Sequence, residues 1–385
     1  MPADHLPLDG LLVVDLSQFL AGPYASLRLQ DLGARVIKVE RPDKGDLSRS
    51  LYLSDTMLDG ENTIFHAINR GKESIALNLK CTAGLNALKK LVSKADVFIQ
   101  NFRPGVIERL GLAYDDVQKF APHVVYGSVS GYGPDGPWAR YPGQDLLAQA
   151  RSGAMWLNGD EGQGPVPFGL AVADMFAGAN LAQGILASLV RRGMSGKGAH
   201  VETSLLESMV DFQFEMLATH LNDGGRPPRR AEYRSAHAGL AAPYGVYRTS
   251  DGYIAIAMTP VDRLADLLDL EALEAFGDAP RSWFAERDTI KRLIAAYLAE
   301  RTTDHWLDLL EPHDVWCARV LGWQDLLEHE AFQRLDMLQT VERQGGGAMR
   351  LTRSPLRING ARGMSNRAAP AIGAHSAMIR DEFDL

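Results

Sequence analysis

Short runs of β-branched residues alternate with helical patterns over about the first 200 residues, and this alternation is the strongest constraint on the fold. The patterns predict strands at residues 11–15, 35–40, 96–100, 123–129 and 198–203. They predict helices at residues 23–31, 82–93, 144–151 and 205–220, together with a long helix after Asp174. Strands that alternate with helices pair in the same direction, so the chain is expected to form an α/β fold with a parallel, doubly wound sheet.

A polar segment rich in glycine and proline, residues 222–230, interrupts this alternation. Beyond it, residues 244–257 predict two strands joined by a Ser-Asp-Gly turn, and helices follow as far as Leu310. The chain has 385 residues, enough for two domains. A smaller α+β domain is therefore expected over roughly residues 225–330, followed by a turn-rich tail with a strand at residues 354–359.

The composition excludes several classes of protein. The net charge of -8 argues against a nucleic acid or an anionic membrane as the main partner. Cys81 and Cys317 stand in no metal or redox spacing, and the first residues lack the pattern of a signal peptide. The helix around residues 181–190 reads as too short and too polar to span a bilayer. A soluble protein of the cytoplasm is expected.

Asp174 is a lone carboxylate in the apolar segment Phe168-Gly-Leu-Ala-Val-Ala-Asp-Met-Phe-Ala-Gly178. Because a carboxylate in such surroundings loses its water, it must be paired, hydrogen-bonded or protonated. One interpretation is an N-cap that satisfies the first turn of the following helix. The other is a nucleophile kept anionic by the positive end of the helix dipole.

Several familiar motifs are absent from the sequence. The turn after the first strand, residues 17–23, has a single glycine where dinucleotide-binding proteins carry Gly-x-Gly-x-x-Gly. Residues 193–198 lack the spacing of a P-loop, and Val129 stands where a hydrolase elbow needs serine. The ten histidines show no metal-ligand spacing, so no metal site is predicted.

A set of segments is nevertheless shared with a known family. In chain order they are Phe19-Leu-Ala-Gly-Pro-Tyr24, Gly33-Ala-Arg-Val-Ile-Lys-Val-Glu-Arg-Pro42 with Gly45-Asp46, Asn69-Arg-Gly-Lys-Glu-Ser-Ile-Ala-Leu-Asn-Leu-Lys80, Ala95-Asp-Val-Phe-Ile-Gln-Asn-Phe-Arg-Pro-Gly105, Ser130-Gly-Tyr-Gly-Pro-Asp-Gly-Pro137, Ala173-Asp174 and Pro243-Tyr-Gly-Val-Tyr247. In this order and spacing the chain closely resembles the class III (CaiB/BaiF-type) coenzyme A-transferases. That family includes formyl-CoA, carnitine and aryl-succinate CoA-transferases and the α-methylacyl-CoA racemases. The resemblance extends from about Leu8 to Asp381.

The resemblance implies a Rossmann-like large domain built from both ends of the chain, with a smaller α+β domain inserted between them. It also implies that two subunits interlock as a homodimer. On this basis residues 1–205 form the first part of the large CoA-binding domain, and residues 206–230 form a helix and linker. Residues 231–330 form the small domain, and residues 331–385 return to the large domain.

The resemblance also implies a mechanism. The residue that matches Asp174 attacks the carbonyl of an acyl-CoA, and the released thiolate converts the anhydride to an aspartyl-CoA thioester. A free carboxylic acid then takes over the CoA. Coenzyme A and acyl-CoA are substrates, and no permanently bound cofactor or metal is implied. Asp145 matches a carboxylate that orients the site, although it could instead compensate the charge at a helix N-terminus. Gln144, directly before it in the chain, is also predicted to belong to the catalytic site.

For CoA binding, the family uses backbone around the first turn and a set of polar, basic and aromatic side chains. Backbone contacts are expected at Phe19, Leu20 and Ala21, and side-chain contacts at Arg41, Lys72, Asn101, Phe102, Arg103 and Arg109. Arginine and lysine suit phosphate groups, and an aromatic ring suits adenine. Each basic residue taken alone is more simply explained as a solvated surface charge.

Departures from the family pattern separate its branches. Racemases need a histidine and a glutamate to move the α-proton, but Gln144 and Thr259 stand at those positions and do not titrate near neutral pH. Leu20 replaces a first-turn glutamine of oxalate users, and residues 237–242 lack their glycine-rich lid. The sequence therefore favours an acyl-CoA:carboxylate CoA-transferase. The alternatives are an acyl-CoA racemase or epimerase and, from another class, a nucleotide-binding oxidoreductase, against which the missing glycines speak.

Overall fold

The computed structural model describes residues 6–385 except residues 52, 54, 55, 59, 278, 344, 345, 364 and 366. The chain divides into two compact units. Unit 1 comprises Met1–Ala148, Ala171–Phe212 and Gln333–Leu385, and unit 2 comprises Gln149–Leu170 and Gln213–Phe332. Unit 2 thus includes residues 149–170, which the sequence had assigned to the large domain.

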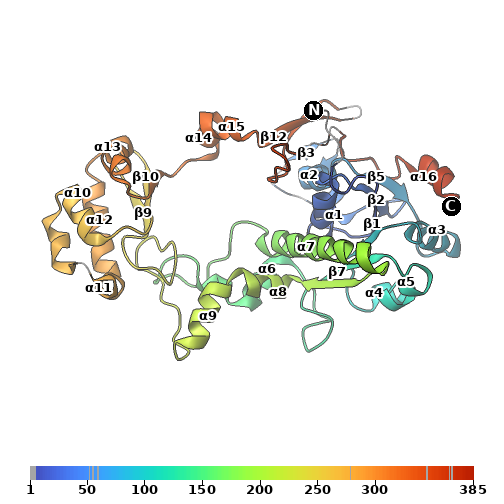
Figure 1. Cartoon of the computed structure of the whole chain (residues 1–385), viewed down its shortest axis with the longest axis horizontal. Helices are drawn as coiled ribbons and strands as arrows, with labels where there is room; N and C mark the ends of the chain where they lie inside the picture. Colours follow the sequence, from blue (N-terminus) through green and yellow to red (C-terminus); the bar gives the residue numbers. More distant parts are fainter. Residues whose placement is uncertain are drawn as a thin grey trace. The chain divides into compact units, whose positions relative to one another are not determined.

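Unit 1 is built on a six-stranded sheet in the order β5-β2-β1-β6-β7-β8 (Figure 1). The strands are β1 (Leu12–Asp15), β2 (Arg35–Glu40), β5 (Glu73–Ala76), β6 (Val97–Gln100), β7 (Val125–Ser130) and β8 (His200–Ser204). Every pair is parallel, and Val13 lies opposite Val36 on one side and Val97 on the other. The predicted parallel sheet is confirmed, although β5 was not predicted.

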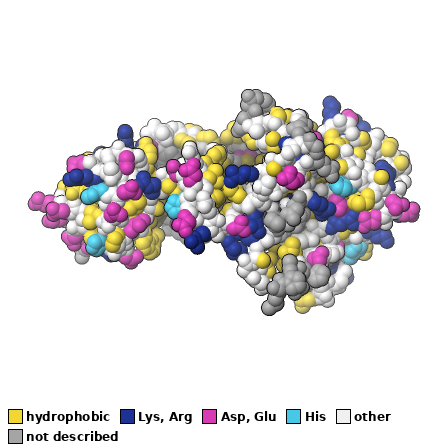
Figure 2. All heavy atoms as spheres, turned by 90° about the horizontal axis from the view of Figure 1, so that it is seen from above, with side chains coloured by type: hydrophobic (Ala, Val, Ile, Leu, Met, Phe, Trp, Pro, Cys, Tyr) yellow, Lys and Arg dark blue, Asp and Glu magenta, His cyan; other side chains and the backbone are white. Residues whose placement is uncertain are grey.

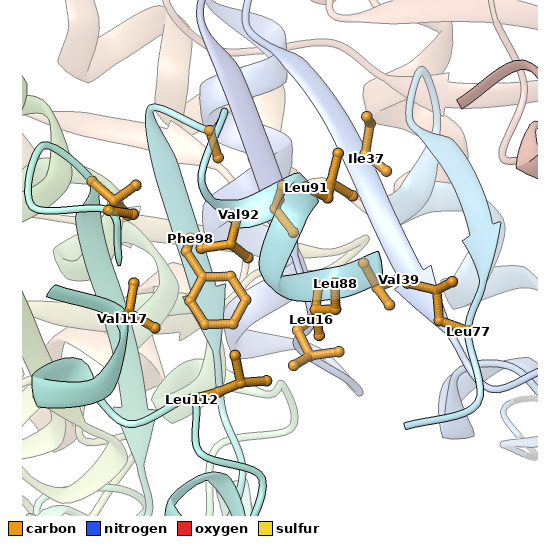
Figure 3. Packing of buried hydrophobic residues seen from close by; sticks show 14 of the residues in the cluster. Leu16, Ile37, Val39, Leu77, Leu88, Leu91, Val92, Phe98, Leu112 and Val117 are labelled. Carbon is orange, nitrogen blue, oxygen red and sulfur yellow. The ribbon is translucent and has the colours of Figure 1, made fainter. Parts of the chain in front are cut away.

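Helices cover both faces of this sheet, as a parallel sheet requires. On one face, Leu88, Leu91 and Val92 of α3 pack against Ile37, Val39 and Phe98 of the strands (Figure 3). The opposite face is covered by α1 and α7, which lie side by side (Figure 1). The helices of unit 1 are α1 (Ala21–Asp31), α2 (Thr63–Asn69), α3 (Thr82–Val92), α4 (Val106–Arg109), α5 (Tyr114–Phe120), α7 (Val172–Ser195), α8 (Leu205–Phe212) and α16 (Ser376–Phe383), and α6 (Asp145–Ser152) begins in this unit.

Helix α7 is longer than the sequence suggested. Its 24 residues, in length and composition, are sufficient to cross a membrane. Part of it is buried, however, where it packs against α1, β7 and β8 in unit 1. A Cβ atom at Gly178 would lie only 2.5 Å from the Ala21 carbonyl oxygen, so α1 and α7 approach at a point where only glycine fits.

The C-terminal segment completes the edge of the sheet at β5. The His375 amide donates to the Ser74 carbonyl oxygen at 3.0 Å, and the Ser74 amide donates to His375 Nδ1 at 3.2 Å. Arg35 of β2 forms ion pairs with Glu73 and with Glu382 of α16. Residues from the end of the chain are therefore part of the same sheet layer as residues from its beginning.

Unit 2 contains an antiparallel sheet in the order β11-β10-β9, packed against helices. Its strands are β9 (Gly245–Arg248), β10 (Tyr253–Ile256) and β11 (Cys317–Arg319), and its helices include α9 (Phe214–Asn222), α10 (Val261–Leu268), α11 (Pro280–Ala285), α12 (Arg287–Leu298), α13 (Thr303–Leu310) and α14 (Trp323–Glu328), with α15 (Glu330–Leu335) leading back to unit 1. The single helix expected at residues 205–220 is two helices, α8 and α9, which meet at Gln213 where the chain leaves unit 1.

The strand predicted at residues 354–359 is wrong. Leu356 and Ile358 are exposed there, and only Ile358 makes an isolated bridge, to Ala361. The strands of this region are instead the hairpin β12 (Leu338–Glu342) and β13 (Ala348–Thr352), and β3 (Met57–Leu58) pairs with β4 (Glu61–Asn62) earlier in the chain.

Candidate active site

A cleft of about 530 Å³ opens in unit 1 at the carboxyl ends of the parallel strands. Its lining comes from the segments after β1, β2, β5 and β6: Leu16–Gln18, Val39–Pro42 with Asp43, Gly45 and Asp46, Leu77–Lys80, and Phe102 with Leu110. Chain order in the sheet reverses between β1 and β6. Ligands of open α/β sheets bind outside the carboxyl ends of the strands at such a point.

The cleft combines an apolar floor with a few charges. Leu16, Leu77 and Phe102 belong to the hydrophobic core or pack against it. Two exposed cations, Arg41 and Lys80, also line the cleft. An apolar surface beside separate cations suits a ligand that has a flat apolar ring and phosphate groups.

The first turn, residues 17–20, joins β1 to α1, and its residues Ser17 and Gln18 form one wall of the cleft. The side chain of Asn101, just after β6, holds the backbone of Gln18 at both ends: Oδ1 accepts from the Gln18 amide at 2.8 Å, and Nδ2 donates to the Gln18 carbonyl oxygen at 2.7 Å. Gly22 must remain small, since a Cβ atom there would lie 2.4 Å from that of Ser17. Asn101 thus positions the first turn with its own polar atoms.

Two buried ion pairs lie beneath this turn. Asp15 pairs with Lys72 at 3.0 Å, and Lys38 pairs with Asp46 at 2.6 Å. Burial alone would raise the pKa of Asp15, but the charges of Lys72 and Lys38 outweigh it and lower that pKa well below its ordinary value. Burial would likewise raise the pKa of Asp46, which Lys38 lowers. Both carboxylates are therefore ionised at neutral pH.

Lys72 is the clearest correction to the predicted contacts. Its ammonium group is buried, and besides Asp15 it donates to the Pro23 carbonyl oxygen at 2.9 Å, Ser26 Oγ at 2.8 Å and Asn69 Oδ1 at 2.9 Å. Burial lowers the pKa of Lys72 to about 8. A lysine whose donors are all used inside the protein cannot bind a phosphate group, so its role is structural.

The remaining predicted contacts differ in their positions. Arg41 and Phe102 line the cleft. Arg103 and Arg109 are exposed beside it in the chain but do not line it, and α4 has only four residues, too few for a strong phosphate site at its start. Lys80 and its neighbours, by contrast, line the cleft although sequence reasoning missed them. Their position after the carboxyl end of β5 would have been the signal, but that strand was not predicted.

The backbone candidates of the first turn also differ in exposure. Phe19 is 48% exposed, Leu20 is partly buried, and Ala21 is buried under α7. None of the three lines the cleft itself. Gln144 is exposed and directly precedes α6.

Asp174 lies in the first turn of α7 and is partly buried. The residue at the N-cap position, Ala171, has no side chain that could cap the helix. Asp145 supplies this function from α6, because its Oδ1 accepts from the amides of Ala173 at 2.7 Å and Asp174 at 3.2 Å. Among the described residues, no hydrogen-bond donor reaches the Asp174 carboxylate. The N-cap interpretation of Asp174 is therefore replaced by one in which Asp145 is the cap.

Burial raises the pKa of Asp174 to about 7, and the negative charge of Asp145 adds to this rise. The carboxyl group therefore titrates near neutral pH. A carboxylate that is little solvated and accepts no hydrogen bond is a stronger nucleophile than one in water.

Asp174 and the first turn are linked through the contact between α7 and α1. Gly178, one helical turn after Asp174, packs against the carbonyl group of Ala21 and the ring of Tyr24 at the start of α1. The N-terminal ends of the two helices therefore lie together in unit 1. This arrangement brings the unpaired carboxylate to the same end of the sheet as the wall of the cleft.

One group of carboxylates in unit 2 has the spacing of metal ligands. Oxygen atoms of Glu161, Glu232 and Asp288 lie within 4.8 Å of one another. Arg229 forms ion pairs with Glu161 and Asp288, and Arg292 forms one with Glu232. These arginines account for the carboxylates as a salt-bridge cluster.

Comparison with known proteins gives a consistent result. The model of CoA-transferase family III matches residues 8–376. Succinyl-CoA:glutarate CoA-transferase of Mus musculus is 32% identical over 98% of this chain and 86% of its own length. Acetyl-CoA:oxalate CoA-transferase of Acetobacter aceti is 33% identical over 98% of this chain and 96% of its own length.

Solved structures show the same fold. The crystal structure of a CaiB/BaiF family protein from Brucella suis superposes with a TM-score of 0.84, at 31% identity, over 99% of this chain and 100% of that chain. The orthorhombic form of Rv3272 from M. tuberculosis gives a TM-score of 0.84 at 28% identity, over 97% of this chain and 99% of that chain.

Proposed function

Because this chain belongs to CoA-transferase family III, we propose that it transfers coenzyme A from an acyl-CoA thioester to a free carboxylic acid through an aspartyl-CoA thioester on Asp174. The observation that carries the proposal is the Asp174 carboxylate itself. It stands at the start of α7, accepts no hydrogen bond from the described residues, and has a pKa raised to about 7 by burial. Such a carboxylate is poised to attack a carbonyl carbon.

The reaction consists of four acyl transfers. An Asp174 oxygen attacks the thioester carbonyl and expels the CoA thiolate, which leaves a mixed anhydride. The thiolate attacks the Asp174 carbonyl, releases the donor acid as its carboxylate and forms the aspartyl-CoA thioester. The acceptor carboxylate then attacks this thioester and expels the thiolate again. Finally the thiolate attacks the acceptor's carbonyl, which yields the new acyl-CoA and regenerates the Asp174 carboxylate.

Asp145 contributes by holding the start of α7. Its two hydrogen bonds to the amides of Ala173 and Asp174 fix the backbone from which the nucleophile projects. Its negative charge also raises the pKa of Asp174, so the ionised form of that carboxylate is more basic than an ordinary aspartate. Asp145 is therefore a positioning residue in this proposal.

The cleft at the carboxyl ends of the strands is the proposed site for the nucleotide part of CoA. Phe102 and the leucines offer an apolar surface for adenine, and Arg41 and Lys80 offer cations for its phosphate groups. The free acid is proposed to be a small dicarboxylate, since the similar proteins of mouse and Acetobacter aceti are named for glutarate and oxalate.

A homodimer is proposed to cover several apolar faces of the chain. Helix α9 buries none of its residues, and its Phe214 and Leu221 are 70% and 72% exposed. Trp323 of α14 is 85% exposed, and hydrophobic side chains reach the surface in several places of the face shown in Figure 2. Apolar surface of this extent marks an interface in soluble proteins. Size-exclusion chromatography with light scattering tests this part, and a monomer at micromolar concentration would contradict it.

The experiment that tests the reaction is intact-protein mass spectrometry after mixing with acyl-CoA donors. We expect an adduct of the mass of CoA, less water, on the wild-type enzyme and none on Asp174→Asn. An exposed aspartate at a helix start, Asp262 of α10, provides the matched control as Asp262→Asn. An adduct that persists in Asp174→Asn would refute the assignment. Deuterium uptake at the α-carbon without any adduct would instead indicate the racemase alternative.

A further inference from the structure

Phe19 has an unusual backbone conformation for a large residue. Its φ angle is 63°, in the left-handed region that favours glycine. The residue is 48% exposed, so core packing of its side chain does not hold it there. A left-handed conformation of a non-glycine residue is unfavourable and persists only where surrounding contacts impose it.

The contacts that impose it come from the buried pair of Lys38 and Asp46. Asp46 Oδ1 accepts a hydrogen bond from the Phe19 amide at 3.1 Å, and Lys38 Nζ donates to the Ser17 carbonyl oxygen at 2.9 Å. Both side chains are completely buried and lie 2.6 Å apart. The pair therefore holds the residues on either side of Gln18, whose own backbone is hydrogen-bonded to Asn101.

Asp46 is itself firmly placed. Its Oδ1 also accepts from the amide and the hydroxyl of Ser48, at 2.8 and 2.9 Å, and its own amide donates to Glu40 Oε2 at 2.9 Å. Arg49 completes the support by pairing with Glu40 at 2.7 Å. Glu40 and Asp46 line the cleft, so the same group of charges forms part of the cleft lining and holds the turn that makes its wall.

We propose that Lys38 and Asp46 are positioning residues of the CoA cleft, which hold Phe19 in its left-handed conformation and thereby keep the first turn in the shape that binds CoA. This inference rests on the proposed function, because it takes CoA to be the ligand of the cleft. In this role Lys38 and Asp46 do not touch the reacting atoms. Loss of the pair is therefore expected to weaken CoA binding and leave the chemical step at saturating substrate largely intact.

The test is a comparison of four proteins in which residue 19 is glycine or alanine and the pair is present or replaced. Phe19→Gly relieves the backbone strain, whereas Phe19→Ala also removes the ring but keeps the strain. Lys38→Met with Asp46→Ala removes both charges together, so that neither is left buried without its partner. Calorimetric titration with CoA gives the affinity, and urea unfolding gives the stability of each protein.

With alanine at position 19, we expect removal of the pair to weaken CoA binding by about 5- to 30-fold. This factor corresponds to the free-energy cost of placing a residue other than glycine in the left-handed conformation. With glycine at position 19 the loss is expected to be at least about threefold smaller, because glycine adopts this conformation without strain. The aspartyl-CoA adduct is expected to form in all four proteins at saturating donor.

Equal losses of affinity in the glycine and alanine backgrounds would overturn the inference, as would no loss in either. Coupling seen in the unfolding measurements but not in CoA affinity would also overturn it, since the pair would then be purely structural. Failure of the parent enzyme to bind CoA would instead refute the proposed site, and with it the role of the pair in CoA binding. Adduct formation without the CoA-affinity coupling would leave the reaction standing and refute the inference alone.

Discussion

Replacement of Asp174 by asparagine is predicted to stabilise the folded protein above neutral pH. The pKa of this carboxyl rises from 3.8 to about 7 on folding, mainly through burial. Below both values the group is protonated in the folded and the unfolded chain, so it has no effect on stability there. As the pH rises toward 7, the unfolded chain ionises first, and the folded state loses stability relative to it.

The size of this loss follows from the shift. One pKa unit corresponds to about 1.36 kcal/mol, so the free energy of unfolding falls by at most about 4 kcal/mol between about pH 4 and about pH 8. Solvent that reaches the partly buried group reduces the effect, and a decrease of at least about 1 kcal/mol is expected. Asp174→Asn cannot ionise and therefore avoids the whole decrease.

Urea unfolding at several pH values and one protein concentration measures the effect. Asp174→Asn is expected to exceed the wild type in stability by about 1 to 4 kcal/mol at about pH 8, and to differ by less than about 1 kcal/mol at about pH 4. The exposed control Asp262→Asn should show no such trend. A difference between Asp174→Asn and the wild type that is the same at both pH values would refute the reasoning.

A second variant separates the two causes of the shift. Asp145→Asn keeps an oxygen that can accept from the amides of Ala173 and Asp174 but removes the negative charge. The pKa of Asp174 should then fall below about 7 and remain above 3.8, because burial persists. The pH-dependent loss of stability is expected to shift to lower pH. An unchanged midpoint would mean that the charge of Asp145 does not reach Asp174.

Three further predictions concern the cleft and the helix packing. Lys80→Ala should weaken CoA binding severalfold, and the effect should be smaller at high salt. The control Lys94→Ala replaces an exposed lysine outside the cleft and should leave CoA binding unchanged; calorimetric titration measures both affinities. Lys72→Met should lower the free energy of unfolding by about 3 to 5 kcal/mol, because it leaves a buried carboxylate unpaired, and a change below about 1 kcal/mol would contradict its structural role. Gly178→Ala should lower the free energy of unfolding by about 1 to 3 kcal/mol, because its Cβ would lie 2.5 Å from a carbonyl oxygen of α1. At Gly193, on the same helix, a Cβ meets open space, so Gly193→Ala should be neutral or stabilising in urea unfolding.

The sequence predicted those parts of the fold in which burial and local pattern agree. Strand β2 was expected at residues 35–40 and is Arg35–Glu40. The prediction succeeded because the consecutive residues Val36 to Val39 are all buried, so that the strand is covered on both faces. Strand β5 was missed because its polar residues Glu73 and Ser74 break the apolar pattern of a buried strand. Their hydrogen-bond partners, Arg35 and Glu40, lie far away in sequence. The break between α8 and α9 was missed for a similar reason, as it depends on where the chain leaves unit 1.

The candidate site likewise has residues that the local sequence predicts and residues whose role depends on distant contacts. Asp174 was predicted because a single carboxylate in an apolar segment can be recognised from the sequence alone. Lys72 and Lys80 were harder to tell apart without β5. Lys72 directly precedes that strand, whereas Lys80 follows its carboxyl end, which is the side where ligands bind. The left-handed Phe19 and its support by Asp46 depend on contacts across the sheet that no local pattern records.

The closure of the sheet edge by residues 373–376 sets an order of events during synthesis. Gly373, His375 and Ser376 all hydrogen-bond to β5, about 300 residues earlier in the chain. A ribosome adds roughly 5 to 20 residues per second, so roughly 10 to 35 s separate the emergence of α8 from that of α16. During this interval the N-terminal strands exist with one edge open while the larger segment of unit 2, Gln213–Phe332, is being made. We expect the nascent chain to depend on chaperones over this period, and the last segment to act as the step that completes folding of unit 1.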